Sequence, residues 1–243
     1  MKEKNNLLLP LSILSAAILI SVIIFSLVWK SAKSAQQTIT VTGSAKQEVT
    51  SDLAIQRGTI QGTNKDRKLA YQQLQQAVPV LLKFLEAKGF KNDQIELLTI
   101  NGYPVYETAP NGTMTQNISH YVYSQRFQIT SKDVDKIKDL SLTLSSLVEK
   151  GIDVNVEMPE YLYSKIDELK VAIQAAAAKN AKERAEKIAE ATGRSLGPLR
   201  SARMGVIQIT PKNSNLVSDY GINDNTSIVK DITAVVSAAF EIN

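Results

Sequence analysis

The chain has 243 residues, enough for one sizeable domain or two small ones, and a folded body of about 210 residues would bury roughly 70% of the surface exposed by its unfolded chain. It contains no cysteine, which excludes disulfides, thiolate nucleophiles and cysteine-ligated metals. Its 28 basic and 24 acidic residues are spread along the chain without a basic block. This distribution favours a solvated surface and gives no indication of a nucleic-acid groove.

The N-terminal region contains one long apolar segment, residues 7–29. It carries no charge, and fifteen of its 23 residues are Leu, Ile, Val or Phe. As a helix the segment would be about 34 Å long, against roughly 30 Å of hydrocarbon in a bilayer. The sequence therefore predicts a basic tail at 1–6, a transmembrane anchor at 7–29 and a polar tether at 30–37.

A cleavable signal peptide is the alternative interpretation of this segment. Lys2 and Lys4 would form its basic end, and Ala32–Ser34 its small-residue cleavage site. The apolar region of a signal peptide is about 7–15 residues long, and this one is longer, which favours an uncleaved anchor. Lysines lie on both sides of the segment, so charge bias does not decide its orientation.

The domain predicted at residues 38–243 begins with two segments of period-two alternation. Ile39, Val41 and Ala45 alternate with polar residues, and a second alternating run starts at Leu53. Thr50–Asp52 supplies turn residues between the two runs. We therefore expect an opening β-hairpin.

A long amphipathic helix is predicted next. Its apolar face consists of Ala70, Leu74, Ala77, Val78, Leu81, Leu82 and Leu85. Thr63 and Asp66 resemble a capping box at its start, and Gly89 is placed to end it. Pro79 lies inside the helical pattern, which predicts either a kink near Gln75 or two abutting helices.

The middle of the chain repeats the order of hairpin and helix. Strands are predicted at 94–107 and 117–130, with Asn111-Gly112 in their connection. Apolar residues from Val134 to Val148 then recur at helical spacing, and Gly151 ends that pattern. Residues 152–158 alternate as a further strand.

The last third is predicted to begin with the longest helix, from Ser164 to about Thr192. A short strand at 206–209 and a final strand at 232–242 flank a polar loop, Lys212–Ser227, which is long enough to be flexible or to contact a partner. The predicted order is ββαββαβαββ after one transmembrane helix. This indicates an α+β fold with a largely antiparallel sheet and three packed helices.

Three segments carry a resemblance to a known family. In AKNAKERAEKIAEATGRSLGPLRSARMG a small residue occurs at every fourth position from Ala181 to Gly197. Together with ITVTGSAKQEVTSDLAIQRGTI and ITAVVSAAFEI, this segment resembles the SIMPL-domain family, a domain of unknown function in bacterial periplasmic and envelope proteins. The similarity covers roughly residues 39–242.

The resemblance implies several properties. It implies an extracytoplasmic domain, which the predicted anchor would hold at the inner membrane as a single-pass protein. It suggests a homo-oligomer, because relatives form ring-like assemblies. Relatives are also linked to oxidative-stress tolerance and to immunogenicity.

The sequence offers little catalytic chemistry. His120 is the only histidine, so neither a triad nor a multi-histidine metal site can be built from it. The carboxylates that could act as an acid–base pair or bind a hard cation are Asp93, Glu96, Glu107, Asp219 and Asp224. Met114, Met158 and Met204 could be oxidised, but they are few. We expect no catalytic, cofactor-binding or metal-binding residues.

Two functional hypotheses follow. In the first, a non-enzymatic, membrane-tethered envelope protein associates with its own copies or with a partner. In the second, the domain binds or hydrolyses a small envelope ligand in a cleft bordered by the Tyr103–Tyr123 hairpin and the Lys212–Ser227 loop.

Overall fold

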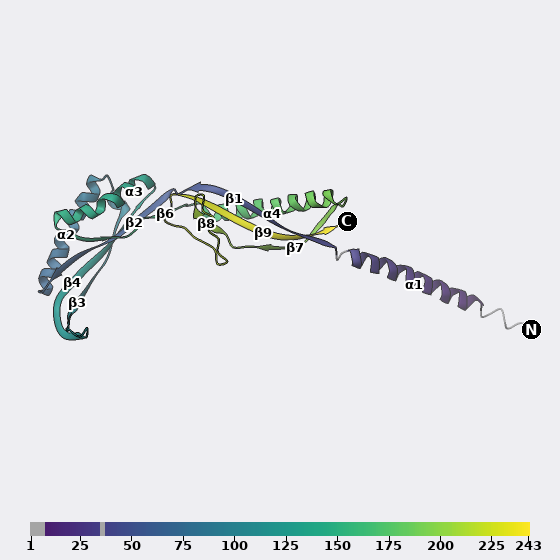
Figure 1. Cartoon of the computed structure of the whole chain (residues 1–243), viewed down its shortest axis with the longest axis horizontal. Helices are drawn as coiled ribbons and strands as arrows, with labels where there is room; N and C mark the ends of the chain where they lie inside the picture. Colours follow the sequence, from purple (N-terminus) through teal and green to yellow (C-terminus); the bar gives the residue numbers. More distant parts are fainter. Residues whose placement is uncertain (1–7, 35–36) are drawn as a thin grey trace, which may run out of the picture. The chain divides into compact units, whose positions relative to one another are not determined.

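The computed structural model describes residues 8–34 and 37–243 (Figure 1). An apolar helix, α1 (Leu8–Ser34), precedes an α+β region with antiparallel sheets, which confirms the predicted fold class. The chain divides into two compact units. Unit 1 comprises residues up to 47 with 167–207 and 233–243, and unit 2 comprises 48–166 and 208–232.

Helix α1 contains residues 8–29 of the predicted apolar segment and continues to Ser34, into the predicted tether. Residue 7 and the basic tail predicted at 1–6 lie outside the described residues. Its side chains between Pro10 and Trp29 are exposed, as expected for a helix whose surface suits lipid rather than a protein core. The hydroxyls of Ser15 and Ser21 donate to the carbonyls of Ser12 and Ala17, each at 2.9 Å. These serines therefore do not leave unsatisfied donors on the apolar surface.

The sheet of unit 1, which we call sheet A, has the strand order β1-β9-β7. Its strands are β1 (Thr38–Thr50), β9 (Val229–Ile242) and β7 (Leu196–Met204). Helix α4 (Ile166–Ala191) packs on it through a stripe of small residues, Ala177, Ala181, Ala185 and Ala189. A fourth strand, β8 (Gln208–Pro211), pairs with β9 and belongs to unit 2.

The sheet of unit 2, sheet B, has the strand order β3-β4-β2-β5. Its strands are β3 (Ile95–Thr108), β4 (Met114–Ser131), β2 (Leu53–Asn64) and β5 (Asp153–Val156), with β6 (Glu160–Leu162) also paired to β2. Two helices, α2 (Arg67–Ala87) and α3 (Val134–Thr143), and the 3₁₀ segments η1 (Asn92–Gln94) and η2 (Leu144–Lys150) complete the unit. Buried Leu, Ile and Phe side chains from α2, α3, η2 and the sheet form its core.

The predicted opening hairpin is wrong, because β1 and β2 belong to different sheets. At the junction the Ser51 N–H donates to the Ile228 carbonyl at 2.8 Å, and the Asp52 N–H donates to the Leu162 carbonyl at 3.0 Å. These residues therefore continue strand pairing instead of closing a turn. The alternation identified the buried face of β1 correctly. On β2 it did not, because the fully buried residues are Ala54, Gln56 and Ile60 and not Leu53 and Ile55. Alternation also carries no information about the pairing partner.

The start of α2 also differs in detail. Asp66 is the N-cap, and its carboxylate accepts from the Leu69 N–H at 3.0 Å. Thr63 belongs to β2, and its N–H donates to the Gln73 side chain. Helix α2 runs without a break past Pro79, so the alternative of two abutting helices is wrong. Buried residues on both sides of the proline hold this helix together against the lost hydrogen bond.

Strand assignments in the last third need correction as well. Helix α4 begins at Ile166, and Ser164 donates its hydroxyl and its N–H to the Asp52 carboxylate at 2.6 and 2.7 Å. Strands β6 and β7 were not predicted, and the strand predicted at 206–209 is found at 208–211. The β7 sequence LGPLRSARM lacks clean alternation because it contains a proline, a glycine and two bulges.

Candidate functional site

The most unusual surface of unit 1 lies at β7, the edge strand of sheet A. Residues paired across an antiparallel ladder lie on the same face of the sheet. Three β7 residues pair with buried residues of β9: Leu199 opposite Phe240, Ala202 opposite Ala238 and Met204 opposite Val236. Yet Leu199 and Met204 are 54% and 55% exposed, whereas Phe240 is 6% exposed. The apolar face of sheet A therefore continues onto β7, where α4 does not cover it.

The narrow contact of α4 explains why β7 is left uncovered. Buried positions recur at every fourth residue of α4, from Leu169 to Ala189, and form a stripe one side chain wide. The outward surface of this helix carries ion pairs four residues apart, such as Lys179 with Glu183. A helix with so narrow an apolar stripe covers only part of a three-stranded sheet.

Close approach of α4 to β1 depends on Gly43. A Cβ atom at Gly43 would lie 2.3 Å from the Ala181 nitrogen and 2.4 Å from the Ala177 carbonyl oxygen. Both contacts are with helix backbone, which cannot rotate away as a side chain can. Gly43 and the alanine stripe therefore bring α4 to the β1–β9 side of the sheet.

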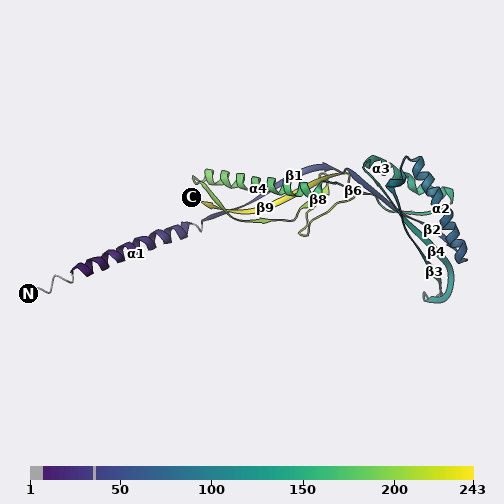
Figure 2. The ribbon, with the colours of Figure 1, turned by 180° about the vertical axis from the view of Figure 1, so that it is seen from behind.

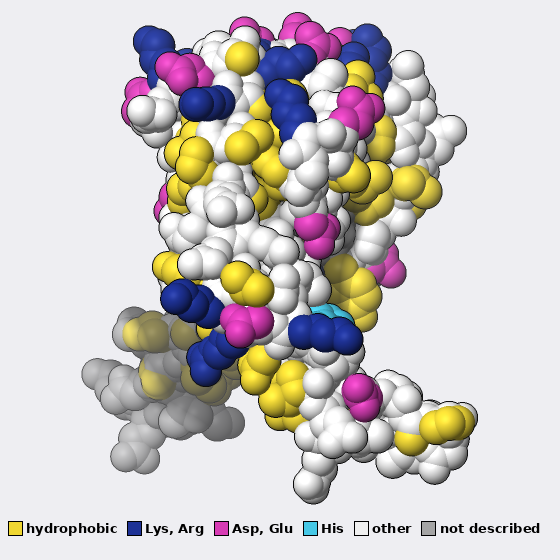
Figure 3. All heavy atoms as spheres, turned by 90° about the vertical axis from the view of Figure 1, so that its left-hand side faces the viewer, with side chains coloured by type: hydrophobic (Ala, Val, Ile, Leu, Met, Phe, Trp, Pro, Cys, Tyr) yellow, Lys and Arg dark blue, Asp and Glu magenta, His cyan; other side chains and the backbone are white. Residues whose placement is uncertain are grey.

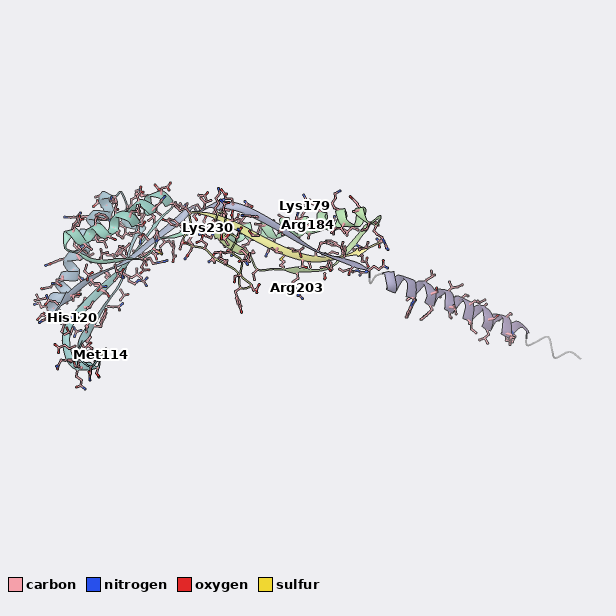
Figure 4. The ribbon with its side chains drawn as sticks, in the orientation of Figure 1. Met114, His120, Lys179, Arg184, Arg203 and Lys230 are labelled. Carbon is pink, nitrogen blue, oxygen red and sulfur yellow. The ribbon has the colours of Figure 1, made fainter. Side chains whose placement is uncertain are left out.

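Side chains of α4 also occupy the opposite edge of the sheet, at β1. The Asn180 side-chain oxygen accepts from the Ser44 N–H at 3.2 Å, and the Arg184 guanidinium donates to the Thr42 carbonyl at 3.0 Å (Figure 4). Both backbone groups belong to the edge strand, so α4 satisfies them there. We call the exposed edge and apolar face of β7, with Leu199, Ala202 and Met204, the β7 surface.

Unit 2 contains a buried lysine that sequence reasoning missed. Lys230 is 3% exposed, and its ammonium donates to the carbonyls of Tyr161 and Asp224 at 2.6 and 2.5 Å. Burial lowers the pKa of Lys230 below its ordinary value, and the nearby Asp224 carboxylate opposes this effect. The only signal in the sequence is a charged Lys-Asp pair inside an apolar strand.

Through its bond to the Asp224 carbonyl, Lys230 is one of several residues that hold the Lys212–Ser227 loop. The Asn213 N–H donates to the Asp231 carboxylate at 2.9 Å, and the Gln208 side chain donates to the Ser218 carbonyl at 2.6 Å. Hydrogen bonds thus connect the loop to the body of unit 2. Its tip exposes three apolar side chains: Leu216, Val217 and Tyr220.

Comparison with known proteins identifies the family. The SIMPL family model, described as a protein of unknown function (DUF541), matches residues 39–240. The chain belongs to the SIMPL family. The matched range includes all but the first residue of β1 and the last two of β9 in the two sheets, and it excludes the described part of α1. The chain is also similar to "Uncharacterized protein YggE" of Edwardsiella ictaluri (strain 93-146), with 24% identity over 177 residues, which cover 72% of this chain and 70% of the relative.

The tyrosine-rich hairpin of this SIMPL domain is used in packing. The Tyr123 ring occupies the space that a side chain at Gly102 would need. Its hydroxyl accepts from the Arg67 guanidinium at 2.8 Å, and its ring meets Tyr71 edge to face at 5.4 Å between centroids. These contacts join β3, β4 and the start of α2.

The predicted reactive residues of the SIMPL domain are dispersed. His120 lies on β4 opposite Val105, with its ring nitrogen 3.1 Å from the Ser119 hydroxyl. Figure 3 shows acidic and basic side chains intermixed on one face of the molecule, with the histidine at the surface. Within residues 8–34 and 37–243, no group of three or more His, Cys, Asp and Glu residues is arranged to hold a metal ion.

The five carboxylates that were candidates for chemistry do not form one site. Asp93 lies in η1, whereas Glu96 and Glu107 lie near opposite ends of β3. Asp224 caps its own loop by accepting from the Thr226 N–H and hydroxyl at 2.9 and 2.8 Å. Burial, the largest effect, raises the pKa of Asp224, but hydrogen bonds from Ser227 and Thr226 outweigh it and lower the pKa overall. Asp219 lies elsewhere in the same loop.

Two open cavities in unit 2 measure about 410 and 500 Å³. The first is lined by α2, β2 and the Lys150–Asp153 segment, and the second by residues around Asp93, Ser131 and Lys136. Neither includes a residue of the Tyr103–Tyr123 hairpin or the Lys212–Ser227 loop, so neither supports the predicted cleft. Three exposed methionines lie apart in the chain: Met114 on β4, Met204 on β7 and Met158 between β5 and β6.

Proposed function

We propose that this SIMPL protein is a single-pass protein of the inner membrane whose extracytoplasmic domain self-associates, without catalysis, into a homo-oligomeric envelope assembly. Through that assembly it contributes to envelope or oxidative-stress tolerance. The β7 surface is the observation that carries the proposal, because it combines an edge strand with an uncovered apolar face. The length and composition of α1 support the anchor, although a signal sequence would share these features.

Strand addition is the mode of association that the β7 surface favours. An edge strand presents N–H and C=O groups to which another strand can bond. A second chain placed beside β7 would also cover Leu199 and Met204. A two-fold contact would close a dimer, whereas a head-to-tail contact would generate a ring or a filament.

The arrangement of the polar side chains also supports a protein that acts by binding and not by catalysis. Among the described residues, Lys230 bonds to the Asp224 carbonyl, whereas the ring of the single histidine lies beside the Ser119 hydroxyl on β4. Lys230 in particular is enclosed and bonded to two carbonyls, which suits a structural role.

The oligomer is tested by mass photometry of the full-length protein in detergent. We expect wild type to form a defined oligomer and the Leu199→Lys, Met204→Lys double variant to dissociate, because charges on an apolar edge oppose strand addition. Val217→Lys is the matched control, since Val217 is an 83% exposed apolar residue of unit 2. A strictly monomeric wild type would rule out self-association.

The anchor requires a separate measurement. Membrane fractionation followed by intact-mass determination should recover a membrane-bound chain that retains α1. A soluble mature form beginning near Ala35 would identify α1 as a cleaved signal peptide.

A further inference from the structure

We propose that the end of unit 1 at which β1 begins binds anionic lipid headgroups through Arg194. This inference rests on the proposed function in one respect, namely that α1 remains in the bilayer. It adds a second membrane contact, made by the folded domain itself. We call this part of unit 1 the Arg194 end; it comprises Gln37, Arg194, Ser195 and Asn243.

The covalent chain limits how far the Arg194 end can be from the bilayer. The apolar span ends at Trp29, and the five further residues of α1 up to Ser34 add about 7–8 Å. The three steps from Ser34 to Gln37 reach no more than about 11 Å. Gln37 therefore lies within about 19 Å of the hydrocarbon edge.

This limit brings the Arg194 end within electrostatic reach of the lipid. Headgroups occupy about 5–7 Å beyond the hydrocarbon on each side of a bilayer. The remaining gap is at most about 14 Å, against a Debye length of about 8–10 Å at moderate ionic strength. Because this gap is an upper limit, the chain also allows the Arg194 end to lie within one Debye length of the surface, where attraction between a basic side chain and an anionic surface is not screened out.

Hydrogen bonds bring four chain segments together at the Arg194 end. The Gln37 carbonyl accepts from the Ile242 N–H at 3.0 Å, so the chain has joined sheet A by this residue. Ser195 and Asn243 exchange backbone hydrogen bonds at 3.1 and 3.0 Å. The start of β1, the end of α4, the start of β7 and the end of β9 thus share one end of unit 1 (Figures 1 and 2).

Arg194 is well suited to bind a phosphate from this position. Its side chain is exposed, and its guanidinium donates to the Gln37 side-chain oxygen at 3.2 Å. A guanidinium has five N–H donors in a planar fork that matches phosphate oxygens, and the bond to Gln37 uses one of them. The contact with Gln37 also ties the arginine to the residue nearest the anchor.

Two neighbouring glutamates, Glu190 and Glu241, each have a basic partner of their own. Glu190 pairs with Lys187 at 2.9 Å, and Glu241 pairs with Arg200. Consistent with this pairing, hydrogen bonding to Glu190 raises the pKa of Lys187.

The absence of cysteine from the chain permits a direct test. A nitroxide is attached at Ser195→Cys, and full-length protein is placed at one chain per disc in lipid nanodiscs. The discs contain phosphatidylcholine alone, or an equal mixture of phosphatidylcholine and phosphatidylglycerol. Nickel bound to a small fraction of chelating lipid headgroups broadens the EPR spectrum of a nitroxide that comes close to it. The broadened fraction of the spectrum then reports the fraction of molecules whose Arg194 end contacts the surface.

We expect more headgroup contact in the anionic discs than in the zwitterionic discs. Arg194→Gln should reduce the equilibrium constant for contact between the Arg194 end and the anionic surface about fivefold, the usual effect of one basic residue near such a surface. Raising the ionic strength to about 1 M, where the Debye length is about 3 Å, should have a similar effect. Lys179→Gln is the matched control, because Lys179 is an exposed cation of the same unit three to four turns away on α4.

Contact that is equal in the two lipids, or that is unaffected by Arg194→Gln, would overturn the proposal while leaving the anchor intact. Failure of the protein to enter nanodiscs, or loss of α1 from its intact mass, would instead overturn the retained anchor on which the proposal depends.

Discussion

Substitution of Gly43 by alanine tests the packing on which unit 1 depends. The new Cβ would lie 2.3 Å from the Ala181 nitrogen, whereas ordinary contacts begin at about 3.4 Å. Helix α4 would therefore have to retreat by about 1 Å. The buried cluster around this contact includes Val41, Ala181, Ala185, Ala238 and Phe240. Three of these five residues are alanines, so few large side chains are available to absorb the displacement by repacking.

We expect Gly43→Ala to destabilise the contact of α4 with sheet A by about 3 kcal/mol, at the upper end of the usual cost of overpacking. Hydrogen exchange measures this directly, because α4 amides that open through loss of this contact should exchange roughly 100-fold faster. Gly205→Ala is the control: its Cβ would meet the Val235 carbonyl at 3.4 Å, an ordinary contact. Unchanged protection of α4 in Gly43→Ala would refute the close-approach argument.

Two further substitutions test unit 2. Lys230→Met should destabilise the unit by about 2–3 kcal/mol in urea unfolding at neutral pH, because the buried carbonyls of Tyr161 and Asp224 lose their donor. The pKa of Lys230 is lower in the folded state than its ordinary value of 10.5, so between these two pKa values the unfolded chain binds more protons than the folded chain. The free energy of unfolding of wild type should therefore increase relative to that of Lys230→Met as the pH rises through this window. Asp66→Ala should cost about 1 kcal/mol through loss of the α2 cap, and Thr63→Ala clearly less; equal effects would contradict the assignment of Asp66 as the cap.

Local sequence patterns predicted most helices and strands, because the formation of these elements depends mainly on residues that are close together in the chain. The spacing of apolar residues placed α2 and α3, and the Asn111-Gly112 turn placed the β3–β4 hairpin, where Gly112 has a φ of 82°. Pairing between distant strands is not encoded in such patterns, so β1 and β2 were predicted to form one hairpin and belong to two sheets.

The candidate site was harder to predict for the same reason. The β7 surface exists because α4 stops short of β7, and no pattern within LGPLRSARM reveals what a helix elsewhere in the chain fails to cover. Lys230 was missed because a lysine in a strand is usually exposed, and only the converging carbonyls of Tyr161 and Asp224 show otherwise.

The tight approach at Gly43 also restricts how this sequence can diverge. Enlarging residue 43, or residues 177 and 181 across from it, requires a compensating change in its neighbours, so these positions cannot drift independently. Homologous chains can replace most of their surface and still keep glycine and alanine here. The geometry at Gly43 therefore predicts that the small residues facing each other across this contact change together or not at all.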